Sequence, residues 1–245
     1  DTILSLINQT RKPHEIIIVD DCSSDRSFEI LSKIVTDSNH LDSNLKLIRN
    51  ETNKGSSFTR NTGLEVISGD YFSFLDGDDQ YSTDYIETVN DIYEKHRFQM
   101  LFVQVISKNK KTVRPNIIRF QKHLKPIGDT LYSIPDPVKV LSHESLFAGG
   151  GNVIIAKECL KNIRFDENSK VFEDWDFYFR ILKSSLEEKY SLFLFQKQVL
   201  EFYTDDVVNS LSKIKAKNYK EFQTPKLVSD LKNSIDRSEI SYRER

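Results

Sequence analysis

One stretch of the chain runs from an apolar segment directly into a cluster of acids. Tyr-Phe-Ser-Phe-Leu occupies residues 71–75, and Asp76, Gly77, Asp78 and Asp79 follow it. The short, β-prone and mainly apolar first part predicts a buried strand. Three carboxylates around one glycine repel one another, so we expect a cation beside them, and a hard divalent ion takes oxygen ligands. A solvated acidic turn after a strand is the alternative explanation.

Apolar strands alternate with amphipathic helices through the first 106 residues. The predicted strands cover 15–20, 45–49, 71–75 and 100–106. The predicted helices cover 2–9, about 25–35, about 58–67 and about 83–96. This alternation predicts an α/β fold with a mostly parallel sheet covered by helices. Ligands of such sheets bind beyond the carboxyl ends of the strands, and the acids follow two of these ends.

The pattern becomes looser after residue 108. Several prolines predict that 108–145 is mainly loop with short strands. Beyond it, the sequence predicts strands near 152–156 and 190–203, a helix over 173–184, and a polar helical segment from about 213. The chain is long enough to bury a substantial core.

Composition argues against several classes of protein. The formal net charge is −2, which does not suggest a polybasic nucleic-acid binder. The 16 Phe and 10 Tyr residues argue against disorder of the whole chain. Cys22 and Cys159 form no CxxC pair, so a reduced, cytoplasmic protein is the simplest interpretation. No apolar run is long enough to cross a bilayer.

Six segments of the chain form an ordered series. They are Ser-Leu-Ile-Asn-Gln-Thr (5–10), Glu-Ile-Ile-Ile-Val-Asp-Asp-Cys-Ser-Ser-Asp (15–25), Asn-Lys-Gly-Ser-Ser-Phe-Thr-Arg-Asn-Thr-Gly (53–63), Gly-Asp-Tyr-Phe-Ser-Phe-Leu-Asp-Gly-Asp-Asp (69–79), Phe-Glu-Asp-Trp-Asp-Phe-Tyr-Phe-Arg (172–180) and Asn-Ser-Leu-Ser (209–212). The series resembles family 2 of the glycosyltransferases, the inverting enzymes with a GT-A fold. The resemblance is good from 1 to about 106, patchy to 150 and fair from 150 to 212.

The resemblance implies transfer of a sugar from a nucleoside-diphosphate donor, a UDP-sugar in particular, to a hydroxyl of a glycan or lipid-linked acceptor, with inversion. Mn²⁺ or Mg²⁺ would be held by Asp78 and Asp76 together with the donor's phosphates. The composition, poor in Gly and rich in Lys, Asn, Ile and Ser, fits bacterial surface-polysaccharide synthesis. We expect a cytoplasmic protein, with peripheral association at the inner face of the membrane and no nucleic-acid partner.

The remaining nucleotide contacts also follow from the resemblance. It places Asp20, Asp21 and Asp76 against the nucleotide and makes Lys54 and Arg60 contacts of the diphosphate or the base. For both cations, ordinary surface charge is the alternative. Three consecutive glycines, 149–151, allow close approach of the backbone to a bound sugar, or form a plain turn.

The acidic cluster at 173–176 supplies the expected base. Asp174 matches the family's acceptor of the hydroxyl proton, a role that favours a pKa raised by burial. Favourable interaction of carboxylates with a helix dipole is the alternative explanation for acids at this helix start. The resemblance divides the chain into a nucleotide-sugar half (1–106), an acceptor and base half (107–212) and a C-terminal helical extension (213–245).

The resemblance also implies a strand that the N-terminus of this sequence lacks. In the family, a first strand lies between the strands that match 15–20 and 71–75, and residues 2–9 match the helix after it. We therefore expect Ile17–Val19 and Phe72–Phe74 to run parallel without direct pairing. Their separation should be about 9–10 Å, twice the usual spacing of neighbouring strands.

Three other classes of protein share part of these features. Ile-Ile-Ile-Val-Asp-Asp also resembles the first strand of a response-regulator receiver, although receivers are about half this length and leave the acids at 173–176 unexplained. A paired-carboxylate glycoside hydrolase lacks motif support. A glycosyltransferase-like domain that binds nucleotide without turnover would differ from an enzyme by releasing no nucleoside diphosphate in the presence of acceptor.

Overall fold

The computed structural model describes residues 1–37, 44–107, 112–141, 146–147, 150–169, 173–187 and 192–202. The chain divides into two compact units, Asp1–Asp205 and Asp206–Arg245. All described residues belong to the first unit, so the predicted extension at 213–245 lies outside them. Among the described residues, no helix combines the length and apolarity that a membrane span requires.

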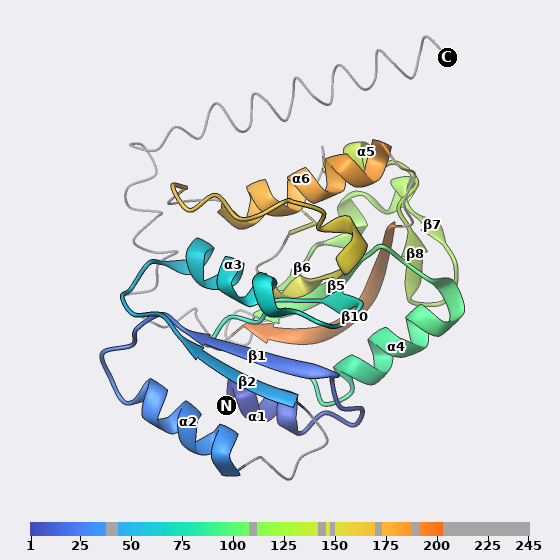
Figure 1. The fold of residues 1–245 in the computed structure, drawn as a ribbon. Coiled ribbons are helices and arrows are strands. Elements are labelled where there is room, and N and C mark those ends of the chain that lie inside the picture. Colours follow the sequence, from blue (N-terminus) through green and yellow to red (C-terminus); the bar gives the residue numbers. More distant parts are fainter. Residues whose placement is uncertain are drawn as a thin grey trace. The chain divides into compact units, whose positions relative to one another are not determined.

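Helices and strands alternate along the first half of the chain (Figure 1). The α-helices are α1 (Thr2–Ile7), α2 (Ser27–Asp37), α3 (Ser56–Val66), α4 (Tyr85–His96), α5 (Pro137–Leu141) and α6 (Glu173–Glu187). The strands are β1 (Glu15–Asp20), β2 (Asn44–Arg49), β3 (Tyr71–Phe72), β4 (Asp79–Tyr81), β5 (Met100–Ser107), β6 (Val113–Arg114), β7 (Lys125–Pro126), β8 (Leu131–Ser133), β9 (Val153–Ala156) and β10 (Leu192–Phe202). Short 3₁₀ turns are η1 (Ile117–Arg119), η2 (Gln121–His123), η3 (Gly150–Asn152) and η4 (Lys157–Cys159).

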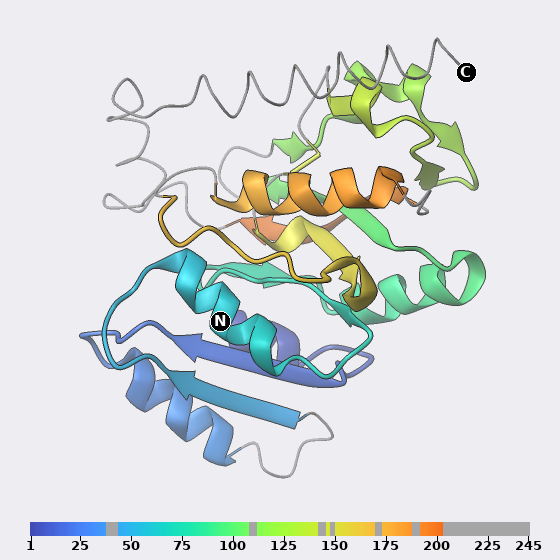
Figure 2. The same cartoon turned by 45° about the horizontal axis from the view of Figure 1, so that its top comes forward.

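Strands β1 and β2 form a small parallel sheet with helices on both faces. Side chains alternate across a strand, and Ile16 and Ile18 of β1 are buried on one face with Ile7 of α1 and with apolar residues of α2. On the other face, α3 packs on β1, where Gly63 lies against Val19. Figures 1 and 2 show α3 on the opposite side of this sheet from α2.

The larger sheet has the strand order β3-β9-β5-β10-β8-β7, with β4 paired to β10 and β6 paired to β5. It is mixed. Strands β5 and β10 run parallel, whereas β9, β4, β6 and β8 run antiparallel to their neighbours. The short loop between β7 and β8 allows only an antiparallel hairpin, because a parallel connection needs a long crossover.

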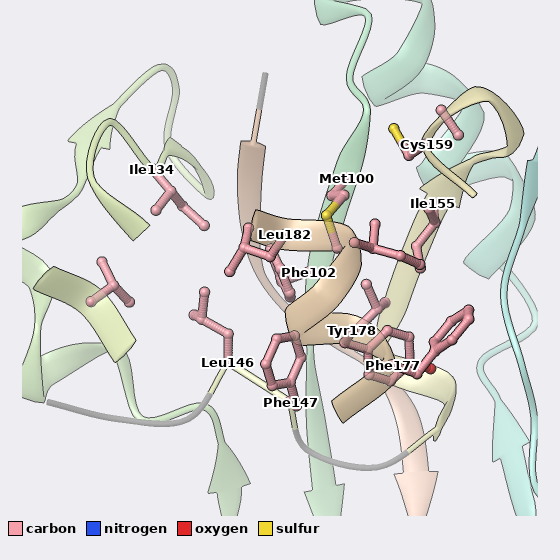
Figure 3. Close-up of a cluster of buried hydrophobic side chains, with 14 of the residues drawn as sticks. Met100, Phe102, Ile134, Leu146, Phe147, Ile155, Cys159, Phe177, Tyr178 and Leu182 are labelled. Atoms are coloured by element: carbon pink, nitrogen blue, oxygen red, sulfur yellow. The ribbon is translucent and has the colours of Figure 1, made fainter. Parts of the chain in front are cut away.

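The central strand β5 separates two layers of core. Met100 and Phe102 belong to the cluster that includes Phe177 and Leu182 of α6, and Figure 3 shows these side chains close to one another around the helix. Leu101, Val103 and Val105 contribute to the opposite cluster, which includes Tyr85 and Ile92 of α4. This period of two explains why the strand is apolar at nearly every position, since both faces of a helix-covered sheet are buried.

Most predicted elements are confirmed, and the exceptions are short strands. The strand predicted at 15–20 is β1 without change, and the one at 190–203 is β10. The strand predicted at 71–75 is correct only for its first two residues. At the next residue, Ser73, the link to β9 is a side-chain hydrogen bond, which the hydroxyl donates to the carbonyl of Val153 (2.9 Å). Strand β4 was not predicted, because three residues give no periodic signal.

The strands that end at Asp20 and lead to Asp76 belong to different sheets. Strand β1 pairs with β2, and β3 pairs with β9, so β1 and β3 do not pair with each other. This agrees with the expectation that they are not direct neighbours. The expected spacing of about 9–10 Å stays a prediction.

Glu15 joins the start of β1 to the turn before β3. Its carboxylate accepts hydrogen bonds from the backbone N–H groups of Ser68 (2.6 Å) and Gly69 (3.1 Å) and pairs with Lys46 Nζ (2.8 Å). The side chain is 9% exposed. Burial would raise the pKa of Glu15, but the bonds from Lys46, Ser68 and Gly69 outweigh it and lower the pKa from 4.5 to about 2. Glu15 therefore stabilises the contact between the two sheets as a carboxylate.

We predict that Glu15→Gln lowers the free energy of unfolding at neutral pH by about 1–3 kcal/mol, the cost of weakening charged hydrogen bonds. The folded pKa lies below the unfolded one, so the contribution is present above about pH 4.5 and is lost as the pH falls toward 2. Urea titrations at neutral and acidic pH measure it. Glu29→Gln, which removes an exposed ion pair, is the control. A wild-type advantage that does not shrink in acid contradicts the assignment.

Candidate active site

The acid-bearing turn between β3 and β4 exposes two of its three carboxylates. The Asp76 side chain is 41% exposed, and Asp78 is also exposed. Asp79 is buried at the start of β4, and its backbone N–H bonds to the carbonyl of Asp76 (3.0 Å). Burial of part of the Asp78 carboxyl and repulsion from Asp76 raise the pKa of Asp78. The turn thus presents two mutually repelling acids at the end of β3.

Arg60 of α3 connects this turn to the start of α6. Its Nη2 donates to Asp76 Oδ1 (2.9 Å), and its Nη1 lies 3.5 Å from Glu173 Oε1. The guanidinium also lies over the Phe165 ring, 5.4 Å from its centroid, and the side chain is only 15% exposed. Burial would lower the pKa of Arg60, but Asp76 and Glu173 raise it above its usual value. Arg60 is therefore a permanent cation between two acids.

The start of α6 carries Glu173, which is buried, and Asp174, which is half-buried. Glu173 Oε1 accepts a hydrogen bond from Ser56 Oγ (2.9 Å) at the start of α3. Asp174 Oδ1 accepts one from the backbone N–H of Trp175 (2.9 Å). Burial, then repulsion from Glu173, raises the pKa of Asp174, although Arg60 lowers it in part. A carboxylate with a raised pKa is suited to accept a proton.

Two buried tyrosines fix the glycine turn beneath Asp76. The Tyr178 hydroxyl of α6 donates to the carbonyl of Gly150 (2.6 Å), and the Tyr81 hydroxyl of β4 donates to that of Gly151 (2.9 Å). A Cβ atom at Gly150 would lie 3.3 Å from Asp76 Oδ1, which is tighter than an ordinary contact. Glycine at this position therefore lets Asp76 lie against the backbone of η3.

Asp21 holds the loop that leads into α3. Its carboxylate accepts hydrogen bonds from Asn50 Nδ2 (2.8 Å) and from the backbone N–H groups of Lys54 (3.0 Å) and Gly55 (2.7 Å). Burial would raise the pKa of Asp21, but these bonds lower it below its usual value. Gly55 has a φ of +89°, a conformation that favours glycine. Asp21 thus shapes the loop.

Asp20 and Lys54 also make local contacts. The buried Asp20 carboxylate accepts hydrogen bonds from the N–H and hydroxyl of Ser23, and it lies 3.3 Å from Arg49 Nε. Lys54 is exposed, and its Nζ lies 4.0 Å from the centroid of the Phe58 ring. Asp20, predicted to contact the nucleotide, therefore lies at the end of β1. Lys54, predicted to contact the diphosphate or the base, lies in the loop that Asp21 holds.

The residues predicted for metal binding fit a cation whose remaining coordination positions are filled by a bound ligand. No group of three or more His, Cys, Asp or Glu side chains capable of holding a metal occurs within the described ranges. Asp76 and Asp78 supply two carboxylates, and both are exposed. Mg²⁺ is usually held by one or two carboxylates plus substrate phosphates, in contrast to a closed protein cage. The donor set matches that pattern.

Most acids of this site were predicted from the sequence, but the hydrogen bonds and ion pairs that link them were not. The structure brings Asp76 and Arg60 into direct contact, and Arg60 also pairs with Glu173, the residue before Asp174. The bonds of Tyr178 and Glu173 were not predicted. The sequence did contain one indication that Tyr178 belongs to the site. Tyr178 lies four residues after Asp174 on α6, and residues at this spacing share a helix face.

Known proteins resemble this chain in sequence and fold. The family described as Glycosyl transferase family 2 matches residues 1–163. The amylovoran biosynthesis glycosyltransferase AmsB of Erwinia amylovora is 26% identical over 73% of this chain and 58% of that protein. The UDP-Glc:alpha-D-GlcNAc-diphosphoundecaprenol beta-1,3-glucosyltransferase WfgD of Escherichia coli is 32% identical over 52% of this chain and 50% of its own length. The chain thus matches about half the length of these relatives.

A solved structure shows the same fold. S. aureus TarS 1–349 in complex with UDP-GlcNAc is 22% identical, with a TM-score of 0.67 over 86% of this chain and 56% of the TarS chain. At this level of identity the likeness concerns the fold, and it confirms the predicted GT-A architecture. The mixed larger sheet and the small parallel sheet are this chain's version of it.

Proposed function

Because this chain belongs to glycosyltransferase family 2, we propose that it transfers a sugar from a nucleoside-diphosphate donor to a hydroxyl group with inversion. A UDP-sugar is the proposed donor, since the similar TarS structure contains UDP-GlcNAc and the WfgD name specifies UDP-Glc. The proposed acceptor is a glycan or a lipid-linked sugar in bacterial surface-polysaccharide synthesis, in keeping with the names of AmsB and WfgD. A cytoplasmic location remains a prediction.

One arrangement carries this proposal: a single arginine pairs with one of the exposed acids and with the residue that precedes the half-buried acid. Asp76 and Asp78 lie in the turn after β3, Asp174 lies at the start of α6, and Arg60 pairs with Asp76 and with Glu173. Exposed carboxylates suit a cation with a diphosphate, whereas the half-buried carboxylate suits proton transfer. The geometry thus supports a donor side and a base side in one site.

On the donor side, Asp76 and Asp78 would hold Mn²⁺ or Mg²⁺. When bound, the ion would neutralise the charge that develops on the leaving diphosphate. Arg60 keeps Asp76 in place from the protein side. Asp21 shapes the loop of Lys54 and Gly55, and we propose that this loop, with Asp20, faces the nucleotide.

On the base side, Asp174 would accept the proton of the acceptor hydroxyl. The hydroxyl oxygen forms a bond to the anomeric carbon while the bond from that carbon to the diphosphate oxygen breaks. The proton passes to Asp174, and the leaving nucleoside diphosphate keeps the bonding electrons. The raised pKa of Asp174 makes it a stronger base than an exposed aspartate.

The metal assignment predicts divalent-cation-dependent binding of UDP. Asp78→Ala should weaken UDP binding in Mn²⁺ by roughly tenfold or more, since a lost charged contact costs ~1.5–3 kcal/mol. Calorimetry with Mn²⁺ and with EDTA measures this effect. Asp91→Ala, at an exposed acid of α4, is the control. Equal UDP affinity in Mn²⁺ and in EDTA would count against the assignment.

The base assignment predicts a catalytic defect without a binding defect. Asp174→Asn should leave UDP affinity nearly unchanged and slow transfer by roughly 10²–10⁴-fold. Wild-type activity should fall as the pH drops through the raised pKa of Asp174, because the protonated acid cannot accept a proton. The Asn variant should lack this pH dependence.

Asp176→Asn is the matched control for that experiment, because Asp176 lies in the same helical turn and pairs with Arg180 (2.6 Å). Release of UDP in the presence of acceptor gives the rate of transfer. Near-normal turnover of Asp174→Asn would make the residue structural. UDP binding without acceptor-dependent release in the wild type would favour a nucleotide-binding domain over an enzyme.

A further inference from the structure

A basic segment, residues 112–127, lies between β5 and β8. It contains Arg114, Arg119, Lys122 and Lys125 and no acidic residue, although the whole chain has a net charge of −2. All four cationic residues are exposed. In the sequence, Lys108, Lys110 and Lys111 come immediately before it. The segment therefore concentrates positive charge on one part of an acidic protein.

The same segment exposes apolar side chains. Ile118 is 84% exposed, the highest value among the large exposed hydrophobic residues of the described chain, and Ile127 is exposed as well. Single surface hydrophobics are common and need no explanation. Two of the five such residues fall within this short basic segment, however. Ile118 directly precedes Arg119 and Ile127 is two residues after Lys125, so the segment exposes apolar and cationic side chains close together in the sequence.

Buried residues of the segment hold this surface in place. Ile117, Phe120 and Leu124 are buried in the core cluster, and the turns η1 and η2 follow one another between them. Asn116 caps the first turn by accepting a hydrogen bond from the N–H of Ile118 (3.2 Å). With these three residues directed inward, Ile118 and Lys122 are left on the outside.

We propose that the exposed face of the basic segment docks on an anionic lipid surface. Lysine and arginine side chains attract acidic headgroups, and an exposed apolar side chain between them enters the interface. A soluble polyanion would use the cations but gain nothing from Ile118. The two kinds of side chain together therefore favour a membrane over a charged polymer.

The turns η1 and η2 connect the basic segment to the core cluster to which α6 contributes. Ile117, Phe120 and Leu124 of the segment share this cluster with Phe177 and Leu182 of that helix. If the proposed transfer uses a lipid-linked acceptor, docking on a lipid surface would bring the protein to the membrane that holds this acceptor.

Vesicle sedimentation of the full chain tests this surface without donor or acceptor, so the result does not depend on the proposed activity. Vesicles of phosphatidylcholine with phosphatidylglycerol should bind the protein, and phosphatidylcholine alone should bind it much less. The combined variant Arg114→Gln, Lys122→Gln and Lys125→Gln should weaken binding on the order of 100-fold, at about fivefold per cation. Ile118→Ser should weaken it roughly 3–10-fold.

Matched controls remove equivalent residues elsewhere. Arg11, Lys33 and Lys95 are exposed cations outside the segment, and their combined change to Gln should leave vesicle binding nearly unchanged. Ile30→Ser removes an apolar side chain of α2 that is 52% exposed and should also have little effect. Equal losses in the control and segment variants would overturn the proposal.

Two further outcomes would also overturn it. One is vesicle binding that does not depend on phosphatidylglycerol or on the three cations. The other is equal binding of soluble polyphosphate combined with no effect of Ile118→Ser, which would identify a charged polymer as the partner. Circular dichroism of each variant shows that the fold is kept, as expected for exposed positions.

Discussion

The guanidinium of Arg60 lies between the carboxylates of Asp76 and Glu173, and the site depends on this arrangement. Helix α3 supplies the cation, the turn after β3 supplies one acid, and the start of α6 supplies the other. Arginine stays charged in proteins, so the pairing holds at any pH at which the acids are ionised. Without it, Asp76, Glu173 and Asp174 would be left with uncompensated repulsion, and a buried acid that loses its partner costs several kcal/mol. The ion pairs thus fix the parts of the fold on which the proposed chemistry relies.

Three aspartates near this ion-pair arrangement differ in their surroundings, and these surroundings suit them to different roles. Asp21 is saturated by hydrogen bonds and has a lowered pKa, which suits a structural anion. Asp78 is exposed, and burial of part of its carboxyl and repulsion from Asp76 raise its pKa, an environment that suits a metal ligand. Asp174 has a pKa raised mainly by burial, which suits a base. Burial, repulsion and hydrogen bonding are the three influences that separate them.

Sequence patterns predicted the long elements and the residue types of the site, and tertiary contacts determined the rest. Strands β1 and β5 follow from continuous apolar runs, because both faces of each strand are covered. Strands β4 and β8 are three residues each, too short for any periodicity, and their partner β10 defines them. The acids at 76 and 78 were identified as a cation site from the pattern of an apolar strand followed by carboxylates, and the role of Asp174 was assigned through family resemblance. The bonds from Tyr81 and Tyr178 to the glycine turn could not be, since they join residues that only the folded chain brings together.

The central claim is that the acids after β3 and at the start of α6 belong to one metal-dependent site. Trp175 is the single tryptophan of the chain and follows Asp174 directly. Incorporation of 5-fluorotryptophan gives one ¹⁹F NMR signal, which a nearby paramagnetic Mn²⁺ broadens and diamagnetic Mg²⁺ does not. Saturating Mn²⁺ with UDP should broaden this signal strongly, and EDTA or Asp78→Ala should restore it. A signal that stays sharp with bound Mn²⁺ and UDP would show that the metal lies far from α6 and would contradict the single site.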